Sequence, residues 1–196
     1  FFAGLGSGYI DPAIPNSSDS LLIDLHLADF NGDGSDDLLA GRGHGEALSR
    51  IFFNDGNGQF DFSDSVALPE TVYGSSNSLH LKTMSSDLDM DGDIDLLILH
   101  SRHDPYYGGS YVQYLENTSS GIFEDVTAEK LLDPLSVPNT FADRLVWTDK
   151  WDLIDVETDG DIDLVGFNTV TKSPWLFLND GAGNFLGKEV EVSRET

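Results

Sequence analysis

The sequence contains no cysteine, and only ten of its 196 residues are lysine or arginine. A chain without cysteine has no disulfide, no thiolate metal site and no cysteine nucleophile. The sequence also lacks any run of the roughly 18 to 20 apolar residues that a membrane-spanning helix requires. We therefore expect neither a membrane span nor cysteine chemistry.

The scarcity of basic residues has an electrostatic consequence. Against the ten Lys and Arg stand 35 Asp and Glu, which gives a formal net charge of -25. The field of such a chain repels polyanions, so nucleic acid is not an expected partner. Cations are the natural partners, although scattered surface carboxylates can also serve solubility alone.

The carboxylates are not scattered but grouped in three similar stretches. These read DFNGDGSDD at 29–37, DLDMDGDID at 87–95 and DVETDGDID at 155–163, and each runs into apolar residues. A second motif follows each stretch: IFFNDGNGQF from Ile51, YLENTSSGIF from Tyr114 and LFLNDGAGNF from Leu176. The two motifs recur about every 60 residues, which indicates a repeat protein.

Within each unit the pattern predicts strands. In LLIDLHLAD the apolar residues Leu21, Ile23, Leu25 and Leu27 alternate with other residues, as in a strand. Asn-Asp-Gly followed by a second Gly is typical of hairpin turns. Each unit therefore has four predicted strands: one on either side of the acidic loop, one ending at the Asn-Asp-Gly turn, and one beginning at the Phe.

Four-stranded units in tandem predict an all-β fold of antiparallel β-propeller blades, with a long β-sandwich as the structural alternative. We expect blades over residues 16–68, 69–130 and 131–196. Because FFAGLGSGYI aligns with IFFNDGNGQF, residues 1–15 are expected to form the second half of a preceding blade. About three and a half blades predict a partial propeller or an assembly subunit, completed by further blades or by self-association.

The acidic loops have the spacing of a calcium site. Positions 1, 3, 5 and 9 carry oxygen-bearing side chains, and glycine at position 6 permits a tight turn that can aim the carbonyl of position 7 inward. The predicted ligands for about three calcium ions are Asp29, Asn31, Asp33, Ser35 and Asp37; Asp87, Asp89, Asp91, Asp93 and Asp95; and Asp155, Glu157, Asp159, Asp161 and Asp163.

Other interpretations of these loops remain. An EF-hand has its last ligand later in the loop and helices on both sides, magnesium requires a stricter octahedron, and zinc prefers His or Cys. The simplest alternative is a hairpin with Asx turns and solvated acids that binds no metal. Three copies in register favour the calcium site over this alternative.

Taken together, the two motifs resemble the FG-GAP/VCBS repeats, which occur in integrin α-subunit propellers and in many secreted bacterial proteins. The resemblance implies a propeller whose loops bind calcium between strands and which serves adhesion or glycan binding in a secreted or cell-surface protein. One departure is the turn at 117–120, Asn-Thr-Ser-Ser, which lacks the usual Asp-Gly.

No catalytic constellation stands out, so we do not expect an enzyme. The irregular stretch SRHDPYYGGSY mixes aromatic and charged residues suited to a glycan or protein ligand, and its candidate residues are Arg102, Asp104, Tyr106, Tyr107 and Tyr111. Three function classes are open: an extracellular calcium-binding recognition module, a structural subunit joined by strand addition, and a non-catalytic part of a secreted carbohydrate-active enzyme.

Overall fold

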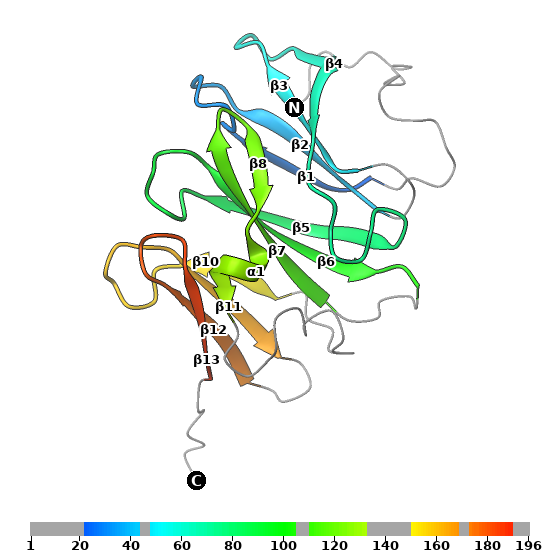
Figure 1. The fold of residues 1–196 in the computed structure, drawn as a ribbon. Coiled ribbons are helices and arrows are strands. Elements are labelled where there is room, and N and C mark those ends of the chain that lie inside the picture. The colour runs from blue at the N-terminus through cyan, green and yellow to red at the C-terminus, as the bar shows by residue number, and fades with distance from the viewer. Residues whose placement is uncertain (1–21, 44–47, 105–109, 133–149, 169–172, 190–196) are drawn as a thin grey trace.

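The computed structural model describes residues 22–43, 48–104, 110–132, 150–168 and 173–189. In these residues three antiparallel sheets follow one another along the chain (Figure 1), and we call them blades 1, 2 and 3. This arrangement confirms the predicted all-β fold of four-stranded units. The half-blade expected over residues 1–15 lies outside the described residues.

In each blade the strands pair in chain order, so every blade is a simple meander. Blade 1 contains β1 (Leu22–Ala28), β2 (Asp37–Arg42), β3 (Arg50–Asn54) and β4 (Phe60–Ala67). Blade 2 contains β5 (Ser78–Ser86), β6 (Asp95–Arg102), β7 (Ser110–Ser119) and β8 (Ile122–Asp125). Blade 3 contains β10 (Trp151–Ile154), β11 (Asp163–Asn168), β12 (Ser173–Asn179) and β13 (Phe185–Glu189).

Two short elements follow blade 2 and were not expected. They are the helix α1 (Thr127–Lys130) and the strand β9 (Leu131–Leu132), which pairs in parallel with β13 of blade 3. In the described part of the chain no helix is long and apolar enough to cross a membrane.

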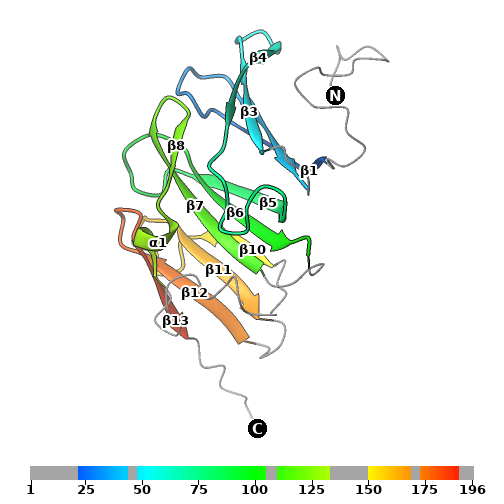
Figure 2. The ribbon, with the colours of Figure 1, turned by 45° about the vertical axis from the view of Figure 1, so that its right-hand side comes forward.

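The blades stack face to face, with blade 2 between the other two (Figures 1 and 2). Leu39 and Ile51 of blade 1 pack with Leu96, Ile98 and Leu115 of blade 2. The opposite face of blade 2 packs on blade 3 through Leu97 and Tyr114, which meet Trp151, Leu164 and Phe177. A blade is thus buried on both faces only when it has a neighbour on each side.

The first strand is oriented differently from what its apolar alternation suggests. Ile23, Leu25 and Leu27 are exposed, whereas the polar side chains between them face blade 2. Asp24 Oδ2 accepts a hydrogen bond of 2.6 Å from the Thr83 backbone N–H, and His26 Nε2 lies 2.8 Å from Ser85 Oγ. The contact between the first strands of blades 1 and 2 is therefore polar.

Candidate metal sites

The three acidic loops join the first and second strands of each blade. We call them loop 1 (between β1 and β2), loop 2 (between β5 and β6) and loop 3 (between β10 and β11). Figure 1 shows all three on the same side of the stack, at the left in that view. Equivalent loops of a meander fall at equivalent places in each blade, so the repeat itself gathers the carboxylates along one side of the molecule.

A shared backbone turn shapes each loop. The glycines at position 6 have φ of 90° (Gly34), 101° (Gly92) and 104° (Gly160), a region that favours glycine. Position 4 is also left-handed, with φ of 60° at Met90 and 59° at Thr158. A β-branched residue in this conformation is strained, and nothing in the sequence pattern singled out position 4.

The aspartate at position 1 holds this turn closed. The backbone N–H of position 6 donates to it in every loop: Gly34 to Asp29 at 2.8 Å, Gly92 to Asp87 at 3.1 Å and Gly160 to Asp155 at 3.1 Å. In loops 1 and 2 the position 5 carboxylate accepts from position 7, as Ser35 donates to Asp33 and Asp93 to Asp91, each at 2.9 Å. The side chains predicted as ligands thus also form the Asx turns of the alternative interpretation.

Position 9 has a structural task that its predicted role as a ligand did not include. Asp37, Asp95 and Asp163 are fully buried. Each accepts two backbone N–H groups, one from position 2 of its own loop and one from the asparagine that begins the hairpin turn of its blade. The donors are Phe30 and Asn54, Leu88 and Asn117, and Val156 and Asn179, at 2.8–3.0 Å.

Burial makes two of these carboxyl groups, those of Asp37 and Asp95, weaker acids than usual by raising their pKa. Desolvation raises the pKa of Asp95 to about 6, against hydrogen bonds from the Asn117 and Leu88 N–H groups that lower it. Desolvation also raises the pKa of Asp37. A cation placed among such carboxylates would stabilise their ionised forms.

Loop 2 is the best-formed candidate site. Asp87, Asp89 and Asp95 each offer a carboxylate oxygen, and these oxygens all lie within 4.8 Å of one another. Among the described residues no other group of three or more His, Cys, Asp or Glu meets this condition. Asp87 Oδ1 is buried without a hydrogen-bond partner. Three carboxylates and an unpartnered buried oxygen fit a hard cation such as calcium.

Lys130 lies beside this loop. Its Nζ is 2.5 Å from Glu116 Oε2 and 3.7 Å from Asp89 Oδ2, and it donates at 3.3 Å to the Ala182 carbonyl of blade 3. This ammonium group from α1 partly neutralises the acidic cluster of blade 2.

In the other two loops the carboxylate oxygens converge less closely than in loop 2. In loop 1 Asp29 accepts three backbone N–H groups and Asn31 donates to Asp33 at 3.2 Å, so the polar groups satisfy one another. In loop 3 Glu157 is exposed, but Asp161 has a buried Oδ1 without a hydrogen-bond partner. Desolvation and the neighbouring Asp159 raise the pKa of Asp161 to about 6.

The asparagine of each hairpin turn holds the neighbouring loop backbone by hydrogen bonds, a role that the calcium prediction did not contain. Asn117 Nδ2 donates to the Ile94 carbonyl of its own loop at 3.2 Å and to the Phe30 carbonyl of blade 1 at 2.9 Å. Asn179 Nδ2 bonds the Ile162 and Leu88 carbonyls in the same way, at 3.2 and 2.7 Å. The recurrence of this asparagine in all three units was the signal that could have identified it.

The hairpin without Asp-Gly keeps the same asparagine in place by another turn. In the blade 2 hairpin turn the residues with positive φ are Ser120 (47°) and Gly121 (83°), whereas in the blade 1 hairpin turn they are Gly56 and Gly58. The Gly121 N–H still donates to Asn117 Oδ1 at 3.1 Å. The departure from the repeat pattern therefore leaves the asparagine contacts intact.

The predicted ligand-binding residues are only partly brought together. Tyr111 is 4% exposed and packs edge-on against Tyr73, with ring centroids 5.8 Å apart, so it is not available at the surface. The Arg102 guanidinium carbon lies 5.1 Å from the centre of the Tyr73 ring. Asp104 is exposed, and its backbone is held by the Asn77 side chain. Tyr106 and Tyr107 lie outside the described residues.

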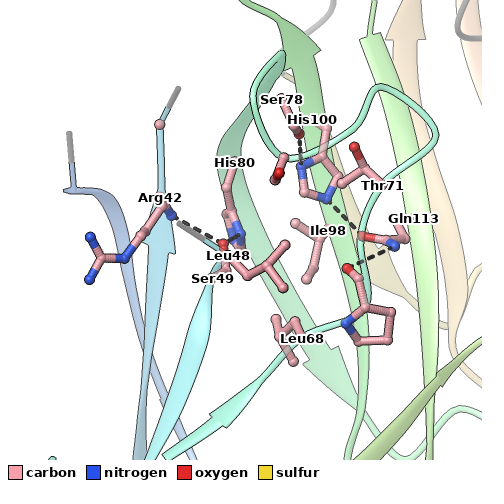
Figure 3. A pocket seen from close by; sticks show the side chains of 13 residues that line it. Arg42, Leu48, Ser49, Leu68, Thr71, Ser78, His80, Ile98, His100 and Gln113 are labelled. Atoms are coloured by element: carbon pink, nitrogen blue, oxygen red, sulfur yellow. Dashed lines mark hydrogen bonds between the residues drawn. The ribbon is translucent and has the colours of Figure 1, made fainter. Parts of the chain in front are cut away.

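A small cavity lies between blades 1 and 2, and its polar lining residues include Arg42, Ser49, His80, His100 and Gln113 (Figure 3). His80 Nδ1 lies 2.9 Å from Ser49 Oγ, and His100 bridges Ser78 Oγ at 3.1 Å and Gln113 Oε1 at 3.0 Å. Burial lowers the pKa of both histidines. The cavity of about 30 Å3 holds only one or two water molecules, so it is part of the core.

Comparisons with known proteins agree with the architecture. Residues 8–81 match a family model described as an FG-GAP-like repeat, and this range includes the first acidic loop and the first hairpin turn. No curated protein and no solved structure gave a significant match. The chain therefore contains an FG-GAP-like repeat, in agreement with the resemblance of its acidic loops and asparagine turns.

Proposed function

We propose that this chain is a calcium-binding β-propeller module that acts in adhesion or recognition outside the cell. The observation that carries the proposal is loop 2, where three carboxylates converge and one buried Asp87 oxygen has no hydrogen-bond partner. A buried carboxylate oxygen without a donor is unfavourable, and a divalent cation would compensate it. The match of residues 8–81 to an FG-GAP-like repeat also supports the proposal of a propeller module.

Calcium suits this loop better than other common metals. The available donors are all oxygen atoms, and no His or Cys belongs to the cluster. Calcium accepts six to eight oxygens in flexible geometry, and sites of moderate affinity are sufficient in extracellular fluids, where calcium is abundant. This is the chemical reason for placing the module in a secreted or cell-surface protein.

The proposed role of the metal is structural. Loops 1 to 3 end on the same side of the stack, and each contacts the hairpin turn of its own blade through position 9. Binding of calcium would fix these loops, and with them the surface that could meet a glycan or protein. Arg102 and Asp104 are the described candidates for contact with such a ligand, but they lie at the other end of β6 from loop 2, so calcium would not fix them directly.

Two other functions are alternatives to this proposal. A structural subunit of an extracellular assembly is favoured by the exposed apolar residues on the outer faces of blades 1 and 3. A non-catalytic or substrate-binding part of a secreted carbohydrate-active enzyme would require catalytic residues outside this chain. Glycan arrays probed with and without a chelator distinguish calcium-dependent glycan recognition from a purely structural subunit.

Native mass spectrometry in calcium tests the metal assignment. We expect up to three bound calcium ions per chain, and one fewer in Asp87→Asn. Glu124→Gln is the matched control, because it removes an exposed acid of the same blade outside the loop and should retain the full number. Failure of the unmodified chain to retain any calcium would contradict the proposal.

A further inference from the structure

Blade 2 contains an ion pair for which the other two blades lack the residues. The residue before the hairpin asparagine is Glu116 in blade 2, whereas it is Phe53 in blade 1 and Leu178 in blade 3. Glu116 Oε2 lies 2.5 Å from Nζ of Lys130, the last residue of α1. Among the described elements α1 is the only helix, and it follows blade 2. The pair is therefore an addition to the repeat at blade 2 and not a part of the shared pattern.

The ammonium group of this pair also contacts the candidate metal site. Lys130 Nζ lies 3.7 Å from Oδ2 of Asp89, the residue at position 3 of loop 2. Asp89 belongs to the group of three aspartates whose carboxylate oxygens lie within 4.8 Å of one another. In the same group Asp87 Oδ1 is buried without a hydrogen-bond partner. One positive charge of the chain thus lies at the edge of the carboxylate cluster that is proposed to bind calcium.

Blade 3 holds the ammonium group in this place. Lys130 Nζ donates at 3.3 Å to the Ala182 carbonyl in the hairpin turn of blade 3. The next residue of that turn is Gly183, where a Cβ atom would lie 2.6 Å from the Tyr114 hydroxyl and 3.2 Å from Lys130 Nζ. Glycine at this position lets the turn approach the ammonium group closely. The Lys130 side chain is 21% exposed, so water and salt screen its charge only in part.

Calcium and this ammonium group would compete for the same carboxylate. Without a metal, Lys130 compensates part of the repulsion between Asp89 and the other acids of the cluster. A calcium ion bound to the cluster would share Asp89 with Lys130, and the two cations would repel each other. At a partly buried position this repulsion is stronger than in bulk water. The lysine therefore opposes the binding of the metal that the carboxylates favour.

We propose that Lys130 sets the calcium affinity of loop 2: it pairs with Asp89 when no calcium is bound, gives up that contact when calcium binds, and so weakens binding at this loop. This inference rests on the proposed calcium binding and names the residue that tunes it. Glu116 and the Ala182 carbonyl retain the ammonium group in both situations, so the link from α1 to blade 3 persists.

Calorimetric titration with calcium tests the proposal on three variants. We expect Lys130→Gln to bind one calcium ion about tenfold more tightly, because the repulsion between the ammonium group and the divalent ion is removed. Lys188→Gln is the matched control, since Lys188 is exposed on β13 and its loss changes the net charge equally. Its affinity should stay within about twofold of that of the unmodified chain. Lys130→Arg keeps the charge and should stay within about threefold.

A double variant assigns the effect to loop 2. Asp87→Asn removes a predicted ligand of this loop, so Asp87→Asn combined with Lys130→Gln should lose the tighter site. The remaining sites should then match those of Asp87→Asn alone. A tenfold gain that survived in the double variant, or an equal gain in Lys188→Gln, would overturn the proposal.

Thermal unfolding separates this role from a purely structural one. In chelator Lys130→Gln should have a lower melting temperature than the unmodified chain, because Glu116 and Asp89 lose a partner. Saturating calcium should raise the melting temperature of the variant more than that of the unmodified chain, since tighter binding adds more stability. The same loss of melting temperature with and without calcium would mean that Lys130 is only structural.

The outcomes distinguish this inference from the proposed function. If the unmodified chain binds calcium at the site that Asp87→Asn removes, and Lys130→Gln binds it no more tightly, the inference fails and the proposed function stands. If the unmodified chain binds no calcium, both fail.

Glu116→Gln decides the question if Lys130→Gln does not fold. It removes the nearer partner of the ammonium group, which then pairs more fully with Asp89, so calcium should bind at least about threefold more weakly. Glu124→Gln, at an exposed acid of the same blade, is its control and should bind calcium as the unmodified chain does. Equal affinities of these two variants would overturn the proposal.

Discussion

The aspartate at position 9 accepts backbone hydrogen bonds and is at the same time a predicted metal ligand. In the folded chain both oxygens of Asp95 already accept backbone N–H groups, from Leu88 and Asn117. A carboxylate oxygen has two lone pairs, so a metal contact can be added to these bonds. Asp87 differs, because one of its oxygens is buried without a hydrogen-bond partner.

This difference predicts separate effects of two conservative substitutions. Asp95→Asn turns an amide NH2 toward a buried N–H donor, so we expect a loss of about 1–3 kcal/mol of unfolding free energy even in chelator. Asp87→Asn keeps an acceptor for Gly92, so it should weaken calcium binding with little loss of stability in chelator. Urea unfolding in chelator and calorimetric titration with calcium measure the two effects. Equal stabilities of the two variants in chelator would contradict the structural role of Asp95.

Sequence reasoning could predict the oxygen-bearing residues of each loop because their spacing is local. It could not predict the backbone hydrogen bond that the position 9 carboxylate accepts from the hairpin asparagine. That asparagine is 22 residues away from Asp95 and 16 residues away from Asp163. The bond from Asn117 to Phe30 spans 87 residues. Contacts of this length follow from how blades stack, and a single repeat does not contain that information.

At the scale of the strands, alternation and turn chemistry were sufficient to place the elements. Strands begin and end at the predicted aspartate, asparagine and phenylalanine positions, most closely in blades 1 and 3. Alternation states which residues share a face but not which face meets the neighbouring blade, as β1 illustrates with its exposed leucines. The strand β9 is only two residues long and depends on β13 for pairing, so no local pattern could reveal it.

The histidines between blades 1 and 2 make this contact sensitive to pH. Burial lowers the pKa of His100 well below its ordinary value of 6.5. Above that value His100 is neutral in both the folded and the unfolded chain. Below it the unfolded chain binds the proton first, so the free energy of unfolding falls as the pH falls, by up to about 1.4 kcal/mol per pH unit for one histidine.

We therefore expect His100→Asn to have a shallower loss of stability than the unmodified chain between about pH 6.5 and about pH 5.5. Urea unfolding of both proteins at constant saturating calcium gives the difference between their free energies of unfolding at each pH. Both proteins contain the same carboxylates, so the titration of those groups cancels in this difference. Parallel profiles would mean that His100 is accessible to protons in the folded chain.

At the scale of the whole molecule, the net charge of -25 opposes compaction. Calcium in the three loops would offset up to six of these charges and bind only the folded chain. Each site occupied at 100 times its dissociation constant adds about 2.7 kcal/mol, and one kcal/mol corresponds to about 2–4 °C for a chain of this size.

Chelation should therefore lower the melting temperature by about 10 °C or more. Differential scanning calorimetry measures this, with sodium chloride at matched ionic strength as the control for screening. Monovalent salt should recover only a small part of the loss, since it screens the carboxylates without binding between them. An unchanged melting temperature would contradict the calcium assignment.

The asparagine that reaches from each blade to the loop before it has a consequence for how such a chain can lengthen. Among the described residues, the elements of a blade that contact another blade in number contact an immediate neighbour, and the same few positions serve at both junctions. A duplicated unit inserted between two blades would find a donor on one side and an acceptor on the other. The architecture can thus gain or lose one unit at a time, without new chemistry at the junctions.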